Sequence, residues 1–131
     1  MTEKVKHVLV VEDNATMLGV VRFALEAAGL KVTTAIDGQQ AWYLLGKSEF
    51  DLVLTDYSMP KMTGGELCER IRRDARLEHL PVILLTAKEL ELNTAHLLND
   101  LSVGVIISKP FSPRQLTRIV SKYLGVEAAS G

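Results

Sequence analysis

The sequence contains few of the residues and patterns that mark disulfide frameworks, zinc sites or membrane spans. Cys68 is the one cysteine among 131 residues, so no internal disulfide can form, and no Cys/His cluster has zinc-site spacing. Apolar runs such as Val8–Val11 are four residues long, far below the roughly 18 residues needed to cross a bilayer. The N-terminus also lacks an apolar stretch of signal-peptide length. We therefore expect a cytoplasmic protein without a membrane segment.

Neither sign of charge dominates the sequence. Lys and Arg total 15, Asp and Glu total 16, and the net charge is −1. Electrostatic nucleic-acid binders normally carry a strong basic excess, so this balance argues against direct contact with nucleic acid. Hydrophobic residues at 47% and charged residues at 24% are typical of a globular protein. The length predicts a single domain over residues 1–131, with a core of about 5–124 and a short tail at 125–131.

Short apolar runs alternate with amphipathic stretches along the chain. Strands are predicted over 8–11, 30–35, 52–55, 82–85 and 105–107. Asn14, Asp37 and Ser112 are predicted helix caps, with Gln40 closing a capping box on Asp37, and Gly29 and Gly125 are predicted helix stops. Further helices are predicted over about 65–74 and 89–100. Five β-then-α units imply a parallel sheet with helices on both faces, because parallel strands need crossover connections. The predicted fold class is therefore α/β, a doubly wound five-stranded parallel sheet.

Polar residues stand where four of these strands end. Glu12 and Asp13 follow the first strand, Asp56 ends the third, Thr86 ends the fourth, and Lys109 follows the fifth. Taken singly, each is explained as a helix cap, a turn former or a solvated charge. Doubly wound sheets, however, place their sites at the carboxyl ends of the strands. We therefore expect these five side chains to lie together on one edge of the sheet.

Such a group of side chains is suited to phosphoryl transfer. Neighbouring carboxylates repel one another unless a cation neutralises them, and Mg²⁺ typically takes one or two carboxylates, several waters and a phosphate oxygen. An ammonium group and a hydroxyl can stabilise the oxygens of the transferring group. One carboxylate then remains to act as a nucleophile and form an acyl phosphate.

Four separated motifs resemble the receiver domain of two-component response regulators. They are Glu12-Asp13, the segment from Asp56 to Gly64, Thr86-Ala87, and Lys109-Pro110-Phe111. The resemblance covers about Val5 to Leu124 and implies a flavodoxin-like sheet in the strand order 2-1-3-4-5. It also implies a phosphorylation-switched signalling module that is not an enzyme, beyond assisting its own phosphorylation and dephosphorylation.

The resemblance further implies a role for each matching residue. Asp56 would accept a phosphoryl group from a phosphohistidine on a sensor histidine kinase or a histidine phosphotransfer protein. Lys109 would pair with that group, and the Thr86 hydroxyl would move toward it. The implied ligands of Mg²⁺ are Asp13 and Asp56 directly, Glu12 mainly through water, and the backbone carbonyl of Ser58.

Two structural features are implied at Pro110 and Gly64. The Lys109–Pro110 bond would be a cis peptide, which costs little only before proline. Gly64 would occupy a loop position that needs either a positive φ or close approach of the backbone.

Ile106 departs from the family pattern. Receivers usually carry an aromatic residue three positions before the lysine, and it turns inward when the threonine moves, whereas a β-branched aliphatic side chain has few χ1 choices. We expect phosphorylation to be reported through backbone shifts and the predicted helix over 89–100, with Ala87 and Pro110 in the same switch. Ser58 and Lys88 match positions where receivers vary and tune hydrolysis. Lys88 either attracts a phosphoryl oxygen, obstructs water, or is solvated.

The predicted helix over 89–100 is acidic, and the last helix carries Arg114, Arg118 and Lys122. These are either two solvated faces or, with the strand over 105–107, a surface for a downstream protein target or a homodimer. In the sequence as given, we expect no DNA-binding or enzymatic output domain, because residues 125–131 are too few to form one. If the chain is complete, we expect its output to be a protein contact; a domain cut from a larger protein is the alternative.

Three other functions compete with this interpretation. A phosphatase of the haloacid-dehalogenase type also uses an aspartyl nucleophile after a strand, but Ser58 stands where that family has a second carboxylate. A flavodoxin-like carrier needs a phosphate-binding loop after the first strand, where Glu12 and Asp13 would repel the anion. A receiver-like interaction module that no longer uses phosphate is disfavoured by the complete set of site residues.

Overall fold

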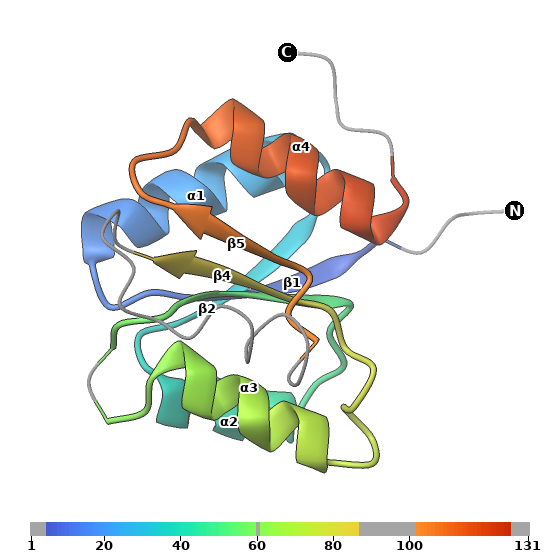
Figure 1. Cartoon of the computed structure of the whole chain (residues 1–131). Coiled ribbons are helices and arrows are strands. Elements are labelled where there is room, and N and C mark those ends of the chain that lie inside the picture. Colours follow the sequence, from blue (N-terminus) through green and yellow to red (C-terminus); the bar gives the residue numbers. More distant parts are fainter. Residues whose placement is uncertain (1–4, 60, 87–101, 127–131) are drawn as a thin grey trace, which may run out of the picture.

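The computed structural model describes residues 5–59, 61–86 and 102–126 (Figure 1). Its strands are β1 (His7–Val11), β2 (Lys31–Ala35), β3 (Leu52–Asp56), β4 (Val82–Thr86) and β5 (Val105–Ser108). Its helices are α1 (Ala15–Ala27), α2 (Gly38–Leu45), α3 (Gly64–Arg73) and α4 (Pro113–Leu124). All five predicted strands are confirmed. The helix predicted over 89–100 lies outside the described residues, as do Ala87 and Lys88.

All five strands run parallel and pair in the order β2-β1-β3-β4-β5. The doubly wound α/β class and the flavodoxin-like order 2-1-3-4-5 are therefore confirmed. The order reverses at β1, whose neighbours are β2 and β3, and Val11 near its end pairs with Thr55 of β3. Ligand sites of doubly wound sheets lie at this switch point, outside the carboxyl ends of the strands.

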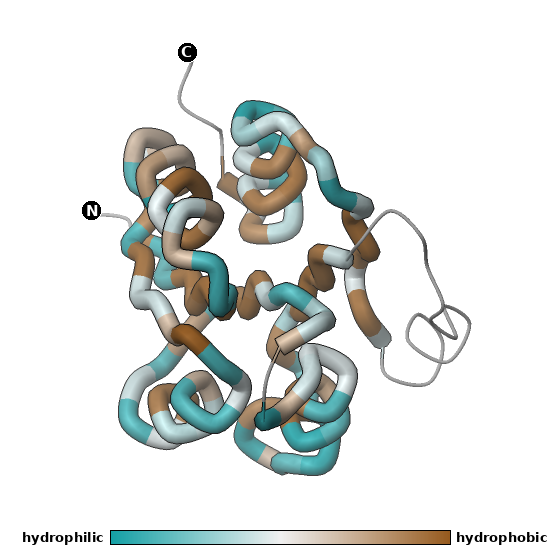
Figure 2. Tube along the Cα trace, turned by 90° about the vertical axis from the view of Figure 1, so that its left-hand side faces the viewer, coloured by the Kyte–Doolittle hydropathy of each residue, from teal (hydrophilic) through white to brown (hydrophobic). Residues whose placement is uncertain are grey.

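The sheet is the middle layer of three. Helices α1 and α4 cover one face, and α2 and α3 cover the other (Figure 1). Successive strand residues point to opposite faces, so Val10 joins the buried cluster that includes Leu116, whereas Leu9 joins the cluster that includes Leu67. Figure 2 shows the resulting hydrophobic band along the sheet between the helices. Burying one such side chain contributes about 1.5–3 kcal/mol, which makes the sheet a firm base for the residues at its edge.

Three of the described helices, α1, α2 and α4, begin at the predicted caps. Each cap side chain accepts a hydrogen bond from the backbone N–H three residues on: Asn14 from Met17, Asp37 from Gln40, and Ser112 from Gln115. Gly29 and Gly125, the predicted stops, have φ values of 89° and 68°, a region that glycine adopts without the cost that a Cβ brings. Among the described residues, no helix is long and apolar enough to span a bilayer.

Two local details differ from the prediction. Helix α3 begins at Gly64, one residue earlier than predicted, because Thr63 is its cap: the Thr63 hydroxyl accepts from Glu66 N, and the Glu66 carboxylate accepts from Thr63 N. The Gln40 side chain does not close a capping box on Asp37 but accepts from Ile36 N at 2.8 Å.

Candidate functional site at the carboxyl ends of the strands

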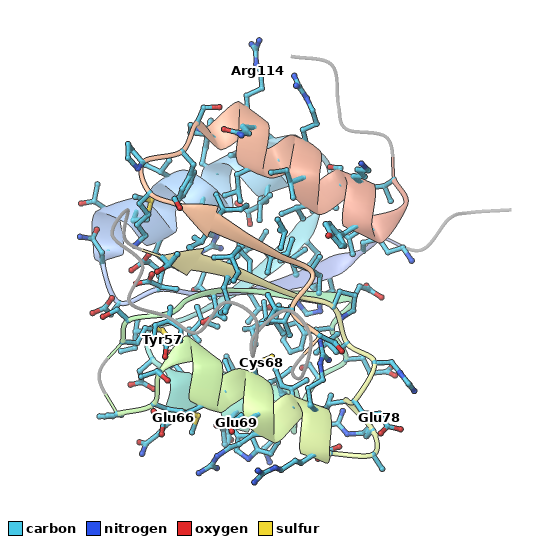
Figure 3. All side chains as sticks on the ribbon, viewed as in Figure 1. Tyr57, Glu66, Cys68, Glu69, Glu78 and Arg114 are labelled. Atoms are coloured by element: carbon cyan, nitrogen blue, oxygen red, sulfur yellow. The ribbon has the colours of Figure 1, made fainter. Side chains whose placement is uncertain are left out.

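An acidic cluster lies at the switch point between β1 and β3. One carboxylate oxygen each from Glu12, Asp13 and Asp56 lies within 4.8 Å of the others. Glu12 and Asp13 directly follow β1, and Asp56 is the last residue of β3. In Figure 3, Tyr57 is labelled at this edge of the sheet, and Glu78 is labelled at the opposite edge. The predicted convergence of the three carboxylates is therefore confirmed.

Two of these carboxylates are buried. Glu12 is 1% exposed and Asp56 is 5% exposed, whereas Asp13 is open to solvent. The Glu12 carboxylate accepts a hydrogen bond from Asn14 N at 3.1 Å, and Glu12 N donates to Ala35 O of β2. These contacts hold Glu12 in place at the edge of the sheet.

Lys109 supplies the positive charge of the site. Its ammonium nitrogen lies 3.1 Å from Glu12 Oε1 and 3.2 Å from Asp56 Oδ1. Lys109 follows β5, and its backbone N–H donates to Thr86 O at the end of β4. The Lys109–Pro110 bond is cis, as predicted. The side chain thus reaches across β4 to the two buried acids.

Burial and charge act against each other on the titration of these groups. Burial raises the pKa of Asp56, and the ammonium of Lys109 opposes that rise. Burial also raises the pKa of Glu12, and the hydrogen bond from Asn14 N opposes it. For Lys109, burial alone would lower the pKa, but the hydrogen bonds and charges of Glu12 and Asp56 raise it. The charged form of Lys109 is therefore favoured. The raised pKa values of Glu12 and Asp56 mean that burial disfavours the negatively charged forms of these two acids.

The chemistry of these donors fits a hard divalent cation. Three carboxylates and one ammonium leave two uncompensated negative charges, and carboxylate oxygens are ligands that Mg²⁺ prefers. Desolvation opposes charge on both buried acids, and a bound cation offsets that cost. The described residues thus provide a suitable magnesium site at Glu12, Asp13 and Asp56.

Gly64 brings the start of α3 against the backbone of Asp56. A Cβ on Gly64 would lie 2.6 Å from Asp56 O and 2.9 Å from Tyr57 Cα, and Gly64 N donates to Tyr57 O at 2.7 Å. A glycine was predicted here for either a positive φ or close approach of the backbone, and the structure shows close approach. The φ of Gly64 lies outside the left-handed region, where Lys61 is found instead at 71°.

The remaining predicted site residues occupy their expected elements. Thr86 is 5% exposed at the end of β4, paired in register with Ser108 of β5. Ser58 is exposed in the loop after β3. Ile106 is partly buried against the cluster shared by α2 and α3.

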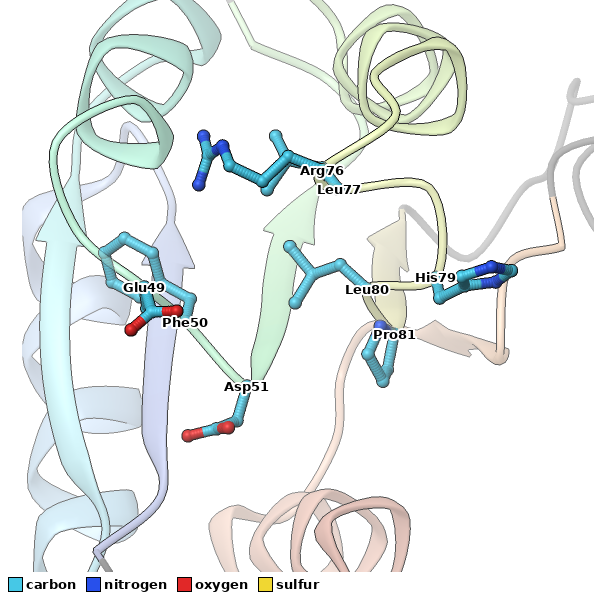
Figure 4. A pocket seen from close by; sticks show the side chains of 8 residues that line it. All are labelled: Glu49, Phe50, Asp51, Arg76, Leu77, His79, Leu80 and Pro81. Carbon is cyan, nitrogen blue, oxygen red and sulfur yellow. The ribbon is translucent and has the colours of Figure 1, made fainter.

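A hollow of about 300 Å³ opens at the opposite edge of the sheet (Figure 4). It lies at the amino ends of β3 and β4, away from the acidic cluster. Its lining residues are Glu49, Phe50, Asp51, Arg76, Leu77, His79, Leu80 and Pro81. None of the predicted site residues lines this hollow.

The strand order, the buried acid pair and the lysine on a cis peptide together define a receiver-type α/β domain. The chain belongs to the response regulator receiver domain family, whose sequence profile matches residues 8–121. Receiver domains are phosphoacceptor signalling modules of two-component systems. This membership favours the signalling interpretation over the phosphatase and the flavodoxin-like carrier.

Two relatives and one solved structure illustrate the likeness. The chain is 39% identical over 113 residues to the phosphate regulon transcriptional regulatory protein PhoB of Pseudomonas aeruginosa, covering 85% of this chain and 48% of that protein. It is 35% identical over 127 residues to a chemotaxis protein CheY homolog of Campylobacter jejuni, covering 94% and 95% of the two chains. The receiver domain of sensor histidine kinase PA1611 from Pseudomonas aeruginosa, solved with a magnesium ion coordinated in its active-site cleft, superposes with a TM-score of 0.82 at 29% identity, covering 93% and 99%.

Proposed function

We propose that Asp56 accepts a phosphoryl group from a phosphohistidine of a sensor histidine kinase or a histidine phosphotransfer protein. The observation that carries this proposal is the position of the Asp56 carboxylate, 3.2 Å from Lys109 Nζ and grouped with two further carboxylates. In the transfer, the bond between the histidine nitrogen and phosphorus breaks as an Asp56 oxygen bonds to phosphorus. The imidazole retains the electron pair of the broken bond.

The neighbouring residues suit this role. Asp56 attacks as a carboxylate, and the ammonium of Lys109 favours that form. After transfer, the same ammonium can pair with a phosphoryl oxygen, because a lysine is a mobile point charge well suited to phosphate. Glu12 would hold Lys109 nearby throughout, since their 3.1 Å contact does not involve Asp56.

We assign Mg²⁺ to Asp13, Asp56 and the backbone carbonyl of Ser58, with Glu12 contributing mainly through water. When bound, the ion would neutralise negative charge on the transferring phosphoryl oxygens. The three carboxylates within 4.8 Å of one another support this assignment. The exposed position of Asp13 leaves the cluster open to solvent, which gives an incoming donor access.

Thr86 is the proposed start of the switch. It is buried at the end of β4, and its carbonyl accepts from Lys109 N at 2.8 Å, so the hydroxyl and the lysine belong to adjacent strand ends. Hydrogen bonding of the hydroxyl to a phosphoryl oxygen would shift the backbone that continues into Ala87. Ile106 has no polar tip and packs on the sheet, so we propose that backbone displacement, not an aromatic rotamer, carries the signal.

The proposed output is a protein contact on the side of the sheet that ends in β5. The exposed basic residues of α4, Arg114, Arg118 and Lys122, lie on this side, and Figure 3 shows Arg114 pointing away from the sheet. A downstream protein target or a second copy of the chain would dock on β5 and α4. The predicted helix over 89–100, which we expect to complete this surface, lies outside the described residues. We place the protein in the cytoplasm, with residues 5–124 as the receiver unit.

Intact mass spectrometry after incubation with acetyl phosphate and Mg²⁺ tests the acceptor residue. We expect one added phosphoryl group on the wild-type chain and none on Asp56→Asn. Asp51→Asn is the matched control, because Asp51 precedes the other end of β3 and its carboxylate accepts from His7 N at 2.8 Å. A wild-type chain that takes no phosphoryl group and binds no beryllofluoride would instead support the phosphate-independent interaction module.

A further inference from the structure

Gly38, the first residue of α2, lies against the loop that follows Asp56. A Cβ on Gly38 would lie 2.6 Å from Met62 Cβ and 2.8 Å from Met62 O. Real Cβ atoms do not approach other atoms this closely, and neither Met62 atom is the mobile end of a side chain. The backbone of the loop at Met62 is therefore in direct contact with the backbone of α2.

The loop connecting β3 to α3 carries Ser58 and is constrained at both ends. At its start it continues from Asp56, and at its end Gly64 packs on the carbonyl of that same residue. Met59 and Met62 are 8% and 6% exposed and belong to the buried cluster under α2 and α3. Displacement at Met62 would therefore be transmitted to the short stretch that holds Ser58 beside Asp56.

An ion pair joins the same two segments. Lys61 Nζ lies 3.7 Å from Asp37 Oδ2, while the other oxygen of Asp37 caps α2 by accepting from Gln40 N at 2.8 Å. Lys61 has a φ of 71°, a conformation that costs energy for a residue with a Cβ. The chain accepts this cost at the point where the loop meets α2.

The start of α2 is itself tied to the acidic cluster through β2. Ala35 ends β2, two residues before Asp37, and its carbonyl accepts from Glu12 N at 3.0 Å. A path of contacts therefore runs from Glu12 through the end of β2 to Gly38 and Met62. From Met62 it continues to Gly64, two residues on, which lies against the carbonyl of Asp56.

We propose that Asp37 and Gly38 are positioning residues for the magnesium site: their contact with Lys61 and Met62 sets the place of the loop carrying Ser58. This proposal rests on the proposed function, because it assumes that Ser58 and Asp56 hold Mg²⁺. It assigns a role to a helix start that touches neither the ion nor the phosphoryl group. Residues that orient metal ligands in this way typically change metal affinity by about 10- to 100-fold when altered.

The test compares two glycine substitutions in helices. Gly38→Ala places a methyl group against the backbone of Met62, whereas Gly19→Ala in α1 meets no atom within 4 Å. Alanine has a higher helix propensity than glycine inside a helix, and this gain is larger for Gly19 inside α1 than for Gly38 at the start of α2. A loss of Mg²⁺ affinity confined to Gly38→Ala is therefore not explained by a loss of helix propensity. By isothermal titration calorimetry with Mg²⁺ on the full chain, we expect Gly38→Ala to raise the Kd about tenfold and Gly19→Ala to leave it unchanged.

A second pair of variants separates a specific effect on Mg²⁺ binding from a general loss of stability. Met62→Ala removes the buried side chain over Gly38, and Leu25→Ala removes a buried side chain from the opposite face of the sheet. Both create cavities of similar kind, and thermal unfolding measures the stability that each one loses. Met62→Ala should weaken Mg²⁺ binding severalfold, and Leu25→Ala should not. In Gly38→Ala and in Met62→Ala, the rate of phosphorylation by acetyl phosphate should return to the wild-type rate at saturating Mg²⁺.

The outcomes separate this inference from the proposed function. An unchanged Mg²⁺ Kd in folded Gly38→Ala, or in Met62→Ala if Gly38→Ala does not fold, overturns the positioning role. A Kd that rises equally in Leu25→Ala overturns it as well. If the wild-type chain neither binds Mg²⁺ nor accepts a phosphoryl group, the proposed function itself fails.

Discussion

The Lys109 ammonium lies 3.1 Å from the Glu12 carboxylate although the two residues are 97 positions apart. Glu12 is 1% exposed, so a buried carboxylate at the end of the first strand is compensated by a cation that follows the last strand. Burying a charge without a partner is costly. This pair therefore joins the two ends of the fold at the site itself.

Replacing Lys109 by methionine should destabilise the chain when no divalent ion is present. Lys109→Met leaves Glu12 and Asp56 without their cation, and breaking a buried ion pair costs about 3–5 kcal/mol. The Lys109 side chain is 27% exposed, so we expect a smaller loss of about 1–3 kcal/mol. Urea unfolding at neutral pH in EDTA measures it. Lys122→Met, an exposed change on α4, should stay within about 0.5 kcal/mol of the wild type, and an equally small effect of Lys109→Met would refute the role of the pair.

Neutralising Asp56 should have the opposite effect on the stability of the metal-free chain, and this effect should depend on pH. Burial raises the pKa of Asp56 above its usual 3.8, with Lys109 opposing. The folded state therefore binds the proton more tightly than the unfolded chain, and the contribution of Asp56 to stability falls as the pH rises from 3.8 through its folded-state pKa. Asp56→Asn has no carboxyl group to titrate at this position, so its stability does not fall for this reason.

The measurement is urea unfolding of both proteins in EDTA across this pH range. The free energy of unfolding of Asp56→Asn minus that of the wild type should increase with pH. Saturating Mg²⁺ should reduce or reverse the difference at neutral pH, because the ion stabilises the folded form that binds it. A difference that is independent of pH and of Mg²⁺ would contradict the predicted charge cost.

Gly64 and Gly65 should respond differently to alanine. A Cβ on Gly64 would meet the backbone of Asp56 and Tyr57, whereas one on Gly65 would meet the ring edge of Tyr57 at 2.9 Å. A partly exposed ring can rotate aside, but strand backbone cannot. We expect Gly64→Ala to lower the free energy of unfolding by about 1–3 kcal/mol and to slow phosphorylation, with a smaller loss for Gly65→Ala. Equal losses would show that the backbone contact at Gly64 is not limiting.

The Thr86 hydroxyl should be needed for the switch but not for phosphoryl acceptance. Thr86→Val replaces a buried hydroxyl with a methyl group and should still be phosphorylated by acetyl phosphate. Addition of beryllofluoride and Mg²⁺ should shift the amide NMR signals of Val105–Ser108 in the wild type and much less in Thr86→Val. Thr34→Val on β2 serves as the control. Full-sized shifts in Thr86→Val would exclude this route for the signal.

Much of the fold and site followed from residue patterns. The apolar runs ending in Asp13, Asp56, Thr86 and Lys109 placed the chemistry on one edge, because parallel strands end together. Asn14 and Ser112 were readable as caps since capping depends on neighbours in sequence. The Thr63 capping box was equally local and readable, from Thr63 and Glu66 three residues apart, but it was missed.

Other features depend on tertiary contacts that no local pattern encodes. Nothing in the sequence around Gly38 indicates that it touches Met62, because that contact depends on how α2 packs beside the loop. The same holds for Arg72 on α3, whose guanidinium donates to the carbonyls of Glu78, Leu80 and Ser102. The residues of the site could be predicted from the sequence, whereas the contacts that pack around the site could be identified only in the structure.

The most direct test of the central claim is to locate the phosphoryl group chemically. An acyl phosphate on aspartate is reduced by borohydride to homoserine, and peptide mass spectrometry then identifies the modified position. After treatment with acetyl phosphate and Mg²⁺, we predict homoserine at position 56 in the wild-type chain and none when Mg²⁺ is replaced by EDTA. Homoserine at another aspartate, or no conversion in the presence of Mg²⁺, would contradict the assignment of Asp56 as the phosphoryl acceptor.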